Sequence, residues 1–204
     1  MDRGPHGAHH RPDVPIRGTI REVRPDGSVK KEGFASFTKA TPILVVTGDG
    51  CRVWRHGDRL RVERGDGRPI FTTDGTRAWD FTADSERPRT RPADRVHYLG
   101  RNQFLLRRRS AADWSGDDFT RPAGPVEETD FAGRRCWTVE LAPPPNKPHP
   151  LRIWVDIESG QMLGYRSEQV GEGAQFVDLI VGEVLDDRLS RGMGRCTHRR
   201  SISR

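Results

Sequence analysis

The sequence predicts a mainly β fold, built from one antiparallel sheet with a single main helix. Short apolar or alternating runs recur along most of the 204 residues, and Gly-, Pro- or Asp-rich turn signals separate them. Strands in series with such turns form antiparallel hairpins. The alternation of strands with long helical patterns that is typical of a parallel sheet is absent. One domain is expected at this length.

The first half of the chain contains the clearest hairpins. Gly57-Asp58 separates two alternating runs and Asp74-Gly75 separates two more, so each pair is expected to form a hairpin with a tight loop. Pro25-Asp26-Gly27 is a turn signal, and residues 28–38 are a plausible return strand after it. The strands expected in this half are 16–24, 28–38, 43–46, 51–56, 60–63, 70–72 and 78–81.

A helix is expected over residues 94–108, between the charged loops 82–95 and 110–125. Apolar and other core-type residues recur there near helical spacing, although Gly100 weakens the pattern. The sheet then resumes with two strictly alternating segments, 137–141 and 151–155. Further strands are expected at 162–166 and 175–185, the last with Val177, Leu179 and Val181 on one face.

No catalytic or metal-binding pattern is recognisable. His6, His9 and His10 lie in a Gly- and Pro-rich start, and the other histidines are scattered, without an H-E-x-x-H cluster. Asp117 and Asp118 are adjacent carboxylates in a Gly/Ser loop, which is more typical of a turn or a helix cap than of an acid catalyst. No serine lies in G-x-S-x-G. We therefore expect a protein that is not an enzyme and uses no metal or cofactor.

The positive charge is concentrated at one end of the chain. The net charge is +6, but six of the 35 basic residues and none of the 29 acidic ones lie in residues 188–204. This leaves 29 residues of each sign in residues 1–187. A nucleic-acid-binding domain carries its excess charge on a folded face, so we expect no nucleic-acid binding by the folded domain.

The cysteines and the tryptophans leave alternatives open. Cys51 and Cys136 are expected in strands, either as buried thiols or as a disulfide in an oxidising compartment. The tryptophans favour core packing. Trp154, however, falls on the strand face opposite Ile153 and Val155, so both faces of that strand must be covered, one of them by a helix and the other by a ligand or lid.

Two segments carry a resemblance to a known family. The strand CWTVEL is followed by LRIWVDIESGQML, in which W-V-D leads into an acidic Ser-Gly turn and a returning strand. Together with RVWRHGDRLRVER and DGTRAWDF upstream, this resembles the LolA-like superfamily of lipoprotein carriers and sigma-factor regulatory lipid sensors, in its actinobacterial form. The resemblance covers residues 16–187.

The resemblance implies an unclosed, curved half-barrel with helical cover on its concave side. It also implies an apolar ligand or a lipid-modified partner on that side, since such a cavity shields an acyl chain from water. The alternative is a protein-interaction module that uses the sheet face or edge and holds no small ligand. The candidate lining residues are Val53, Leu60, Val62, Phe71, Trp79, Val139, Leu141, Ile153 and Val155.

The ends of the chain are expected to lie outside the folded domain. Residues 1–15 are rich in Gly, Pro and His, and residues 188–204 form a basic tail without apolar periodicity, so both are expected to be disordered. The start has no apolar run typical of a signal peptide, and no segment is long and apolar enough for a transmembrane helix. A cytoplasmic protein is expected, although members of the superfamily are often exported.

Overall fold

The computed structural model describes residues 13–25, 33–35, 43–47, 50–99, 102–107 and 119–183. Its main feature is one antiparallel sheet of eleven strands, in the order β10-β11-β12-β13-β14-β1-β4-β5-β6-β7-β8. The strands are β1 (Ile16–Val23), β4 (Cys51–His56), β5 (Arg59–Glu63), β6 (Pro69–Asp74), β7 (Arg77–Asp80), β8 (Arg89–Pro92), β10 (Glu127–Phe131), β11 (Arg134–Leu141), β12 (Leu151–Asp156), β13 (Met162–Ser167) and β14 (Glu172–Val181).

β1 joins two series of hairpins into this one sheet. Strands β4 to β8 follow one another along the chain, as do β10 to β14, and β1 pairs with β4 on one side and with β14 on the other. Its apolar residues Ile16 and Ile20 are fully buried. The N-terminal strand therefore lies at the centre of the sheet and ties the two halves together.

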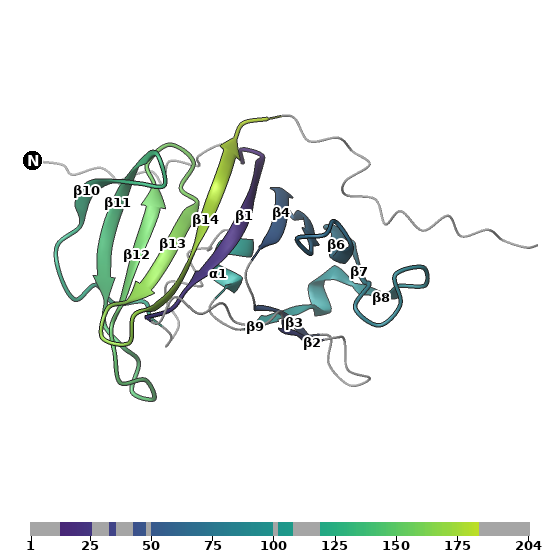
Figure 1. Ribbon diagram of the computed structural model, residues 1–204, viewed down its shortest axis with the longest axis horizontal. Helices are drawn as coiled ribbons and strands as arrows, with labels where there is room; N and C mark the ends of the chain where they lie inside the picture. Colours follow the sequence, from purple (N-terminus) through teal and green to yellow (C-terminus); the bar gives the residue numbers. More distant parts are fainter. Residues whose placement is uncertain are drawn as a thin grey trace, which may run out of the picture.

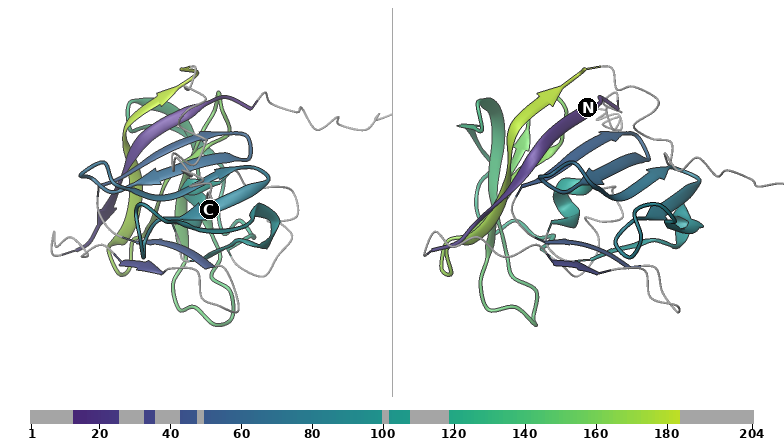
Figure 2. Two further views of the ribbon diagram at one scale, coloured as in Figure 1. Left: turned by 90° about the vertical axis from the view of Figure 1, so that its right-hand side faces the viewer. Right: turned by 45° about the vertical axis from the view of Figure 1, so that its right-hand side comes forward.

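The sheet is open and strongly curved. Its edge strands, β10 and β8, do not pair with each other. Figure 1 shows β10 to β14 and β1 side by side, and Figure 2 shows β4 to β7 turning across the concave side, where the short helix α1 (Gln103–Leu106) lies. The predicted mainly β architecture, an unclosed half-barrel with a helix on its concave side, is confirmed.

The tight hairpins form where the turn signals predict them. Gly57, with φ of 62°, lies between β4 and β5, and Gly75, with φ of 92°, lies between β6 and β7. The Asp74 carboxylate accepts hydrogen bonds from the backbone N–H groups of Thr76 and Arg77, both at 2.8 Å. These contacts satisfy the turn's backbone donors, which is the usual role of Asp in such turns.

The expected hairpin between residues 16–24 and 28–38 is wrong. Of the second segment, the structure describes only β2 (Gly33–Ala35), which pairs with β3 (Ile43–Thr47) in a separate three-stranded sheet. β9 (His97–Leu99) runs parallel to β3 in that sheet. Since both edges of β1 are occupied by β14 and β4, β1 has no free edge for a return strand.

The helix expected over residues 94–108 is much shorter. Ala93–Arg95 forms a 3₁₀ turn and His97–Leu99 forms β9, so in the described residues only Gln103–Leu106 is α-helical. His97–Leu99, in the first half of the predicted helix, forms a strand because it pairs with β3. Tertiary pairing here overrides a weak local helical pattern. The loop expected at 82–95 likewise contains β8, which pairs with β7.

A β-bulge in β14 changes which side chains reach the core. Thr19 pairs with Val177 but Arg17 pairs with Ile180, so β14 contains an extra residue at this point, and Asp178 has a positive φ of 55°. The bulge reverses the alternation. Leu179 and Val181 pack against the core, whereas Val177 lies on the opposite face, so the prediction that these three share a face is wrong.

Most of the expected disordered ends, 1–15 and 188–204, lies outside the described residues. In the described part of the chain, no helix has the length and apolar character needed to cross a membrane.

Candidate binding surface on the concave face

The strand register places eight of the nine predicted lining residues on the concave face. Val53, Val62 and Phe71 lie directly opposite one another on β4, β5 and β6, and Val139 lies opposite Ile153 on β11 and β12. Antiparallel partners that lie opposite each other project to the same side of a sheet. Six of the eight belong to one buried apolar core, and Val139 and Val155 are partly buried and pack against it; the six are Val53, Leu60, Val62, Phe71, Leu141 and Ile153.

Trp79 is the exception. It pairs with Thr72, whereas the neighbouring Ala78 pairs with Thr73, which lies opposite the buried Leu60. Because successive side chains of a strand alternate between faces, the Trp79 indole projects from the convex face. Trp79 is therefore not a neighbour of the other eight.

A short segment of the chain itself occupies the concave face. Phe104, Leu105 and Leu106 of α1 are buried, with 5%, 0% and 1% of their surface exposed, and they belong to the same apolar core as the strands. Phe119, which follows the gap in the described residues, is also buried there. In the part of the chain that the structure describes, this side of the sheet is thus covered by a helix of one turn together with Phe119.

Two polar side chains, Asn102 and Gln161, fasten this segment to the sheet through three hydrogen bonds. Before the helix, the buried Asn102 side chain donates to Glu22 of β1 at 3.2 Å and accepts from the hydroxyl of Tyr165 of β13 at 2.6 Å. At its other end, the Gln161 side chain, between β12 and β13, donates to the Leu105 carbonyl at 3.1 Å. Gln161 is 1% exposed, so this bond lies in the protein interior. We call Phe104–Leu106 with these contacts the α1 plug.

The apolar face is less completely covered near the β10 edge. Trp137 lies opposite Val155, and both are half-buried, as is Val139 two residues further along β11. By contrast, Ile153 and Leu141 are each 1% exposed. Trp137, which is not among the lining residues predicted from the sequence, therefore lies beside two of them, Val139 and Val155. The sequence could not predict this neighbour, because the position of Trp137 opposite Val155 depends on the pairing of β11 with β12.

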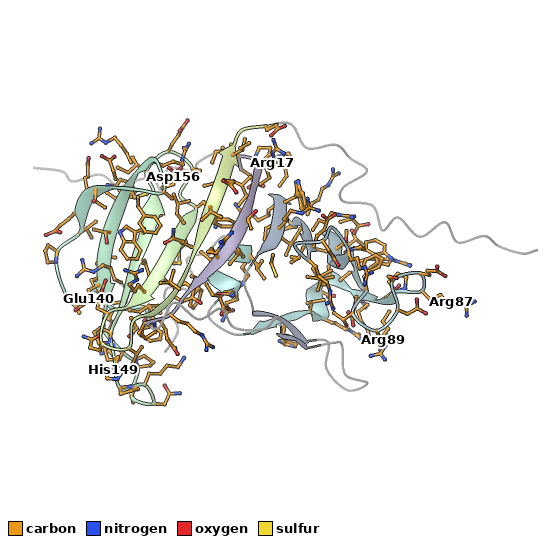
Figure 3. All side chains as sticks on the ribbon, in the orientation of Figure 1. Arg17, Arg87, Arg89, Glu140, His149 and Asp156 are labelled. Atoms are coloured by element: carbon orange, nitrogen blue, oxygen red, sulfur yellow. The ribbon has the colours of Figure 1, made fainter. Side chains whose placement is uncertain are left out.

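The W-V-D-x-E-S-G motif forms a fixed turn between β12 and β13. Asp156, at the end of β12 (Figure 3), is 1% exposed and accepts a bidentate contact from Arg134 at 2.7 and 3.2 Å. It also accepts from the Ser159 N–H at 2.8 Å and from the Ser159 hydroxyl at 2.5 Å. Burial acts to raise the Asp156 pKa, but these hydrogen bonds outweigh it and hold the pKa below the ordinary value.

Trp154 of the same motif is covered on the convex side. Its indole stacks on the Phe131 ring of β10, with ring centroids 4.4 Å apart and an interplanar angle of 10°. Gly164 lies opposite Trp154 on β13, and a Cβ there would come within 2.8 Å of the Phe131 ring. Both faces of this strand are covered, but the expected ligand or lid is not what covers the convex face, where the cover is an aromatic side chain of the edge strand.

Within the described residues, the cysteines and histidines do not assemble a reactive group. Cys51 and Cys136 are both buried free thiols, and burial, followed by the charge of Asp156, raises the pKa of Cys136 to about 11. Cys136 therefore stays protonated at neutral pH. The described residues contain no cluster of three or more His, Cys, Asp or Glu side chains placed to hold a metal ion. His6, His9, His10, Asp117 and Asp118 lie outside the described residues.

Comparison of the sequence with models of known families and with characterised proteins finds no match. Several solved structures are similar in fold. A LolA superfamily protein from Nitrosomonas europaea is 13% identical, with 89% of this chain and 91% of that one covered and a TM-score of 0.30.

Two other solved structures are similar to this chain at a comparable level. MucB from Pseudomonas aeruginosa, solved as a complex with MucA, is 16% identical, with 87% of this chain covered and a TM-score of 0.40. The chain spans 55% of the length of that MucB. An uncharacterised conserved protein from Thermus thermophilus is 10% identical, with 88% and 85% of the two chains covered and a TM-score of 0.45. At these levels of similarity, what this chain binds has to be argued from its own residues. The actinobacterial form stays a prediction.

Proposed function

We propose that this chain is a non-enzymatic binding protein that takes an apolar ligand, an acyl chain or an apolar segment of a lipid-modified partner, on the concave face of its half-barrel. The observation that supports the proposal is the α1 plug. Among the described residues, the α-helical cover of the apolar inner face is a single turn, and a turn of this length has little stability of its own.

The magnitudes allow a ligand to displace the plug. Burying Phe104, Leu105 and Leu106 contributes about 1.5–3 kcal/mol each, or roughly 5–9 kcal/mol together. An acyl chain of about twelve methylenes contributes ~10 kcal/mol at ~0.8 kcal/mol per buried CH₂. The two are comparable, so exchange of the plug for a ligand is reversible and depends on acyl chain length. The proposed entry is the half-buried end lined by Trp137, Val139 and Val155.

The alternative is a protein-interaction module that uses a sheet face or edge and holds no small ligand. The two proposals differ in what an acyl compound does to the concave face. A ligand there changes the surroundings of Trp137, whereas an interaction module leaves them as they are.

Tryptophan emission tests the proposal. In a delipidated variant that keeps Trp137 as its only tryptophan, laurate below its micelle concentration is expected to shift the emission to the blue. A variant that keeps only Trp154, whose indole is stacked on Phe131 on the other face, is the matched control and should not respond. Changing Val155, opposite Trp137, to Trp in the wild-type background should narrow the site and weaken laurate binding.

If neither single-tryptophan variant responds to laurate, palmitate or a lipopeptide while circular dichroism shows the native β spectrum, the concave-face proposal fails and the interaction module remains. An equal response in both variants would indicate adsorption of lipid without a defined site.

A further inference from the structure

A row of arginine, threonine and tryptophan side chains crosses the convex face of the other half of the sheet. Each member lies directly opposite the next on successive strands, and residues beside them, such as Val53 and Ala78, are buried in the core on the other side. The members of this Arg-Trp row are Arg17 (β1), Trp54 (β4), Arg61 (β5), Thr72 (β6) and Trp79 (β7).

The two indoles of the row, Trp54 and Trp79, project from the same face of the sheet. The Arg52 guanidinium lies 5.4 Å from the centroid of the Trp54 ring, and Arg61, with its side chain 13% exposed, lies between Trp54 and Thr72. Trp54 and Trp79 are both half-buried. Three strand spacings of ~4.8 Å separate them by about 14 Å. Their partly exposed surfaces form two ordered apolar contact points on one face.

The charge around the row is positive and unevenly placed. In the described strands β1 and β4 to β7, the convex face carries six arginines and two carboxylates, Glu63 and Asp74. Glu63 is bound by both Arg52 and Arg61 at 2.7 Å, so the centre of the row is neutralised. Further arginines flank this centre on both sides. They are Arg17 and Arg21 on β1, Arg59 on β5 and Arg77 on β7. Two of them have acidic neighbours, since Arg17 pairs with Glu183 at 2.5 Å and Arg59 lies opposite Asp74, so Arg21 and Arg77 carry most of the excess positive charge.

We propose that the Arg-Trp row docks an acidic segment of a partner protein, with apolar side chains of that segment on Trp54 and Trp79 and its carboxylates toward the flanking arginines. Tryptophan and arginine are the residue types that most often dominate binding energy at protein interfaces. The row lies on the face opposite the proposed apolar site and is independent of it, and Trp79, which the sequence grouped with the concave lining, acts here instead.

The same chemistry fits a single-stranded nucleic acid less well. Aromatic platforms with arginine stack bases and contact phosphates, but a phosphate backbone carries a charge at each nucleotide. It would bring phosphates close to the Glu63 carboxylate, which is already bound by its two arginines. A protein segment can place carboxylates at the two flanks and an apolar residue at the centre.

A labelled peptide tests this docking surface. The probe is a fluorescein-labelled peptide of repeating Asp-Leu-Glu-Phe, whose binding is followed by fluorescence anisotropy. Trp79→Ala should weaken binding about tenfold or more, and Arg77→Glu, at an exposed position, should weaken it several-fold and flatten its salt dependence. Arg135→Glu, an exposed arginine of β11 outside the row, is the matched control and should leave the Kd within about twofold.

The outcomes separate the occupants. Equal binding by a peptide with Lys in place of Asp and Glu, an equal loss in Arg135→Glu, or no binding of the acidic probe would each overturn the proposal. So would tighter binding of fluorescein-labelled oligo-dT that Arg77→Glu abolishes, which would assign the face to nucleic acid. If circular dichroism shows that Trp79→Ala does not fold, the peptide affinities of Trp79→Tyr and Arg77→Glu test the proposal in its place. Saturating laurate should not compete with the peptide, so failure here is distinguishable from failure at the concave face.

Discussion

Asp156 shows what a single buried charge contributes to this fold. Its carboxylate receives four hydrogen bonds, from Arg134 and from the N–H and hydroxyl of Ser159, and it is almost fully buried. Hydrogen bonds to charged groups are stronger than neutral ones. In the W-V-D-x-E-S-G motif, these hydrogen bonds give the acidic residue Asp156 the role of orienting a turn.

Replacing Asp156 by Asn should lower the free energy of unfolding at neutral pH by about 2 kcal/mol, because the charge-assisted bonds from Arg134 are lost. The Asp156 pKa is lowered in the folded state, so its stabilisation is present above the ordinary value of 3.8 and is lost as the pH falls toward the lower, folded-state pKa. Urea unfolding of the two proteins should therefore converge on acidification. Glu158→Gln, at a side chain 81% exposed, should change stability little.

Gly164 tests the aromatic cover of Trp154. An added methyl group meets the Phe131 ring at 2.8 Å, so Gly164→Ala should displace the ring, expose the Trp154 indole and cost about 1–3 kcal/mol. Thermal unfolding and acrylamide quenching of Trp154 measure both effects. Gly124→Ala, where a Cβ meets nothing within 4 Å, is the control. Equal stability of the two variants would mean that the Phe131 contact is unimportant.

At the scale of elements, the sequence predicts the hairpins well and the helix poorly. Gly57-Asp58 and Asp74-Gly75 fix tight turns through local backbone geometry, which is readable from the residues alone. The strand His97–Leu99 forms because β3, distant in sequence, pairs with it, and the local sequence pattern does not predict this pairing. β10 has the mostly polar sequence EETDF, so its assignment depends on pairing with β11. The bulge at Asp178 likewise leaves no sequence signal.

The α1 plug yields a prediction at this scale. Asn102 makes no capping bond to the helix, so Asn102→Ala acts through the lost contacts with Glu22 and Tyr165. Two lost bonds at about 1 kcal/mol each should speed hydrogen exchange at the Leu105, Leu106 and Arg107 amides by roughly tenfold or more. Gln103→Ala, in the same turn, is the control, and equal exchange rates in both variants would show that Asn102 does not fasten the plug.

At the scale of the whole molecule, the candidate site is partly readable from sequence. Alternation identifies the apolar face of each strand, so eight of the nine lining residues do share one face. Alternation cannot say which faces of separate strands coincide, which is why Trp79 is misplaced and Trp137 is missed. That information lies in the register across β1, the strand that unites the two halves of the half-barrel.

The central claim is that an apolar ligand takes the place of the α1 plug on the concave face. Hydrogen exchange of the wild-type protein with and without laurate tests it most directly. With ligand bound, the Leu105, Leu106 and Arg107 amides should lose protection, while amides of β11 and β12 keep or gain it. Ligand binding that leaves these three amides as protected as before, or more so, would contradict the claim.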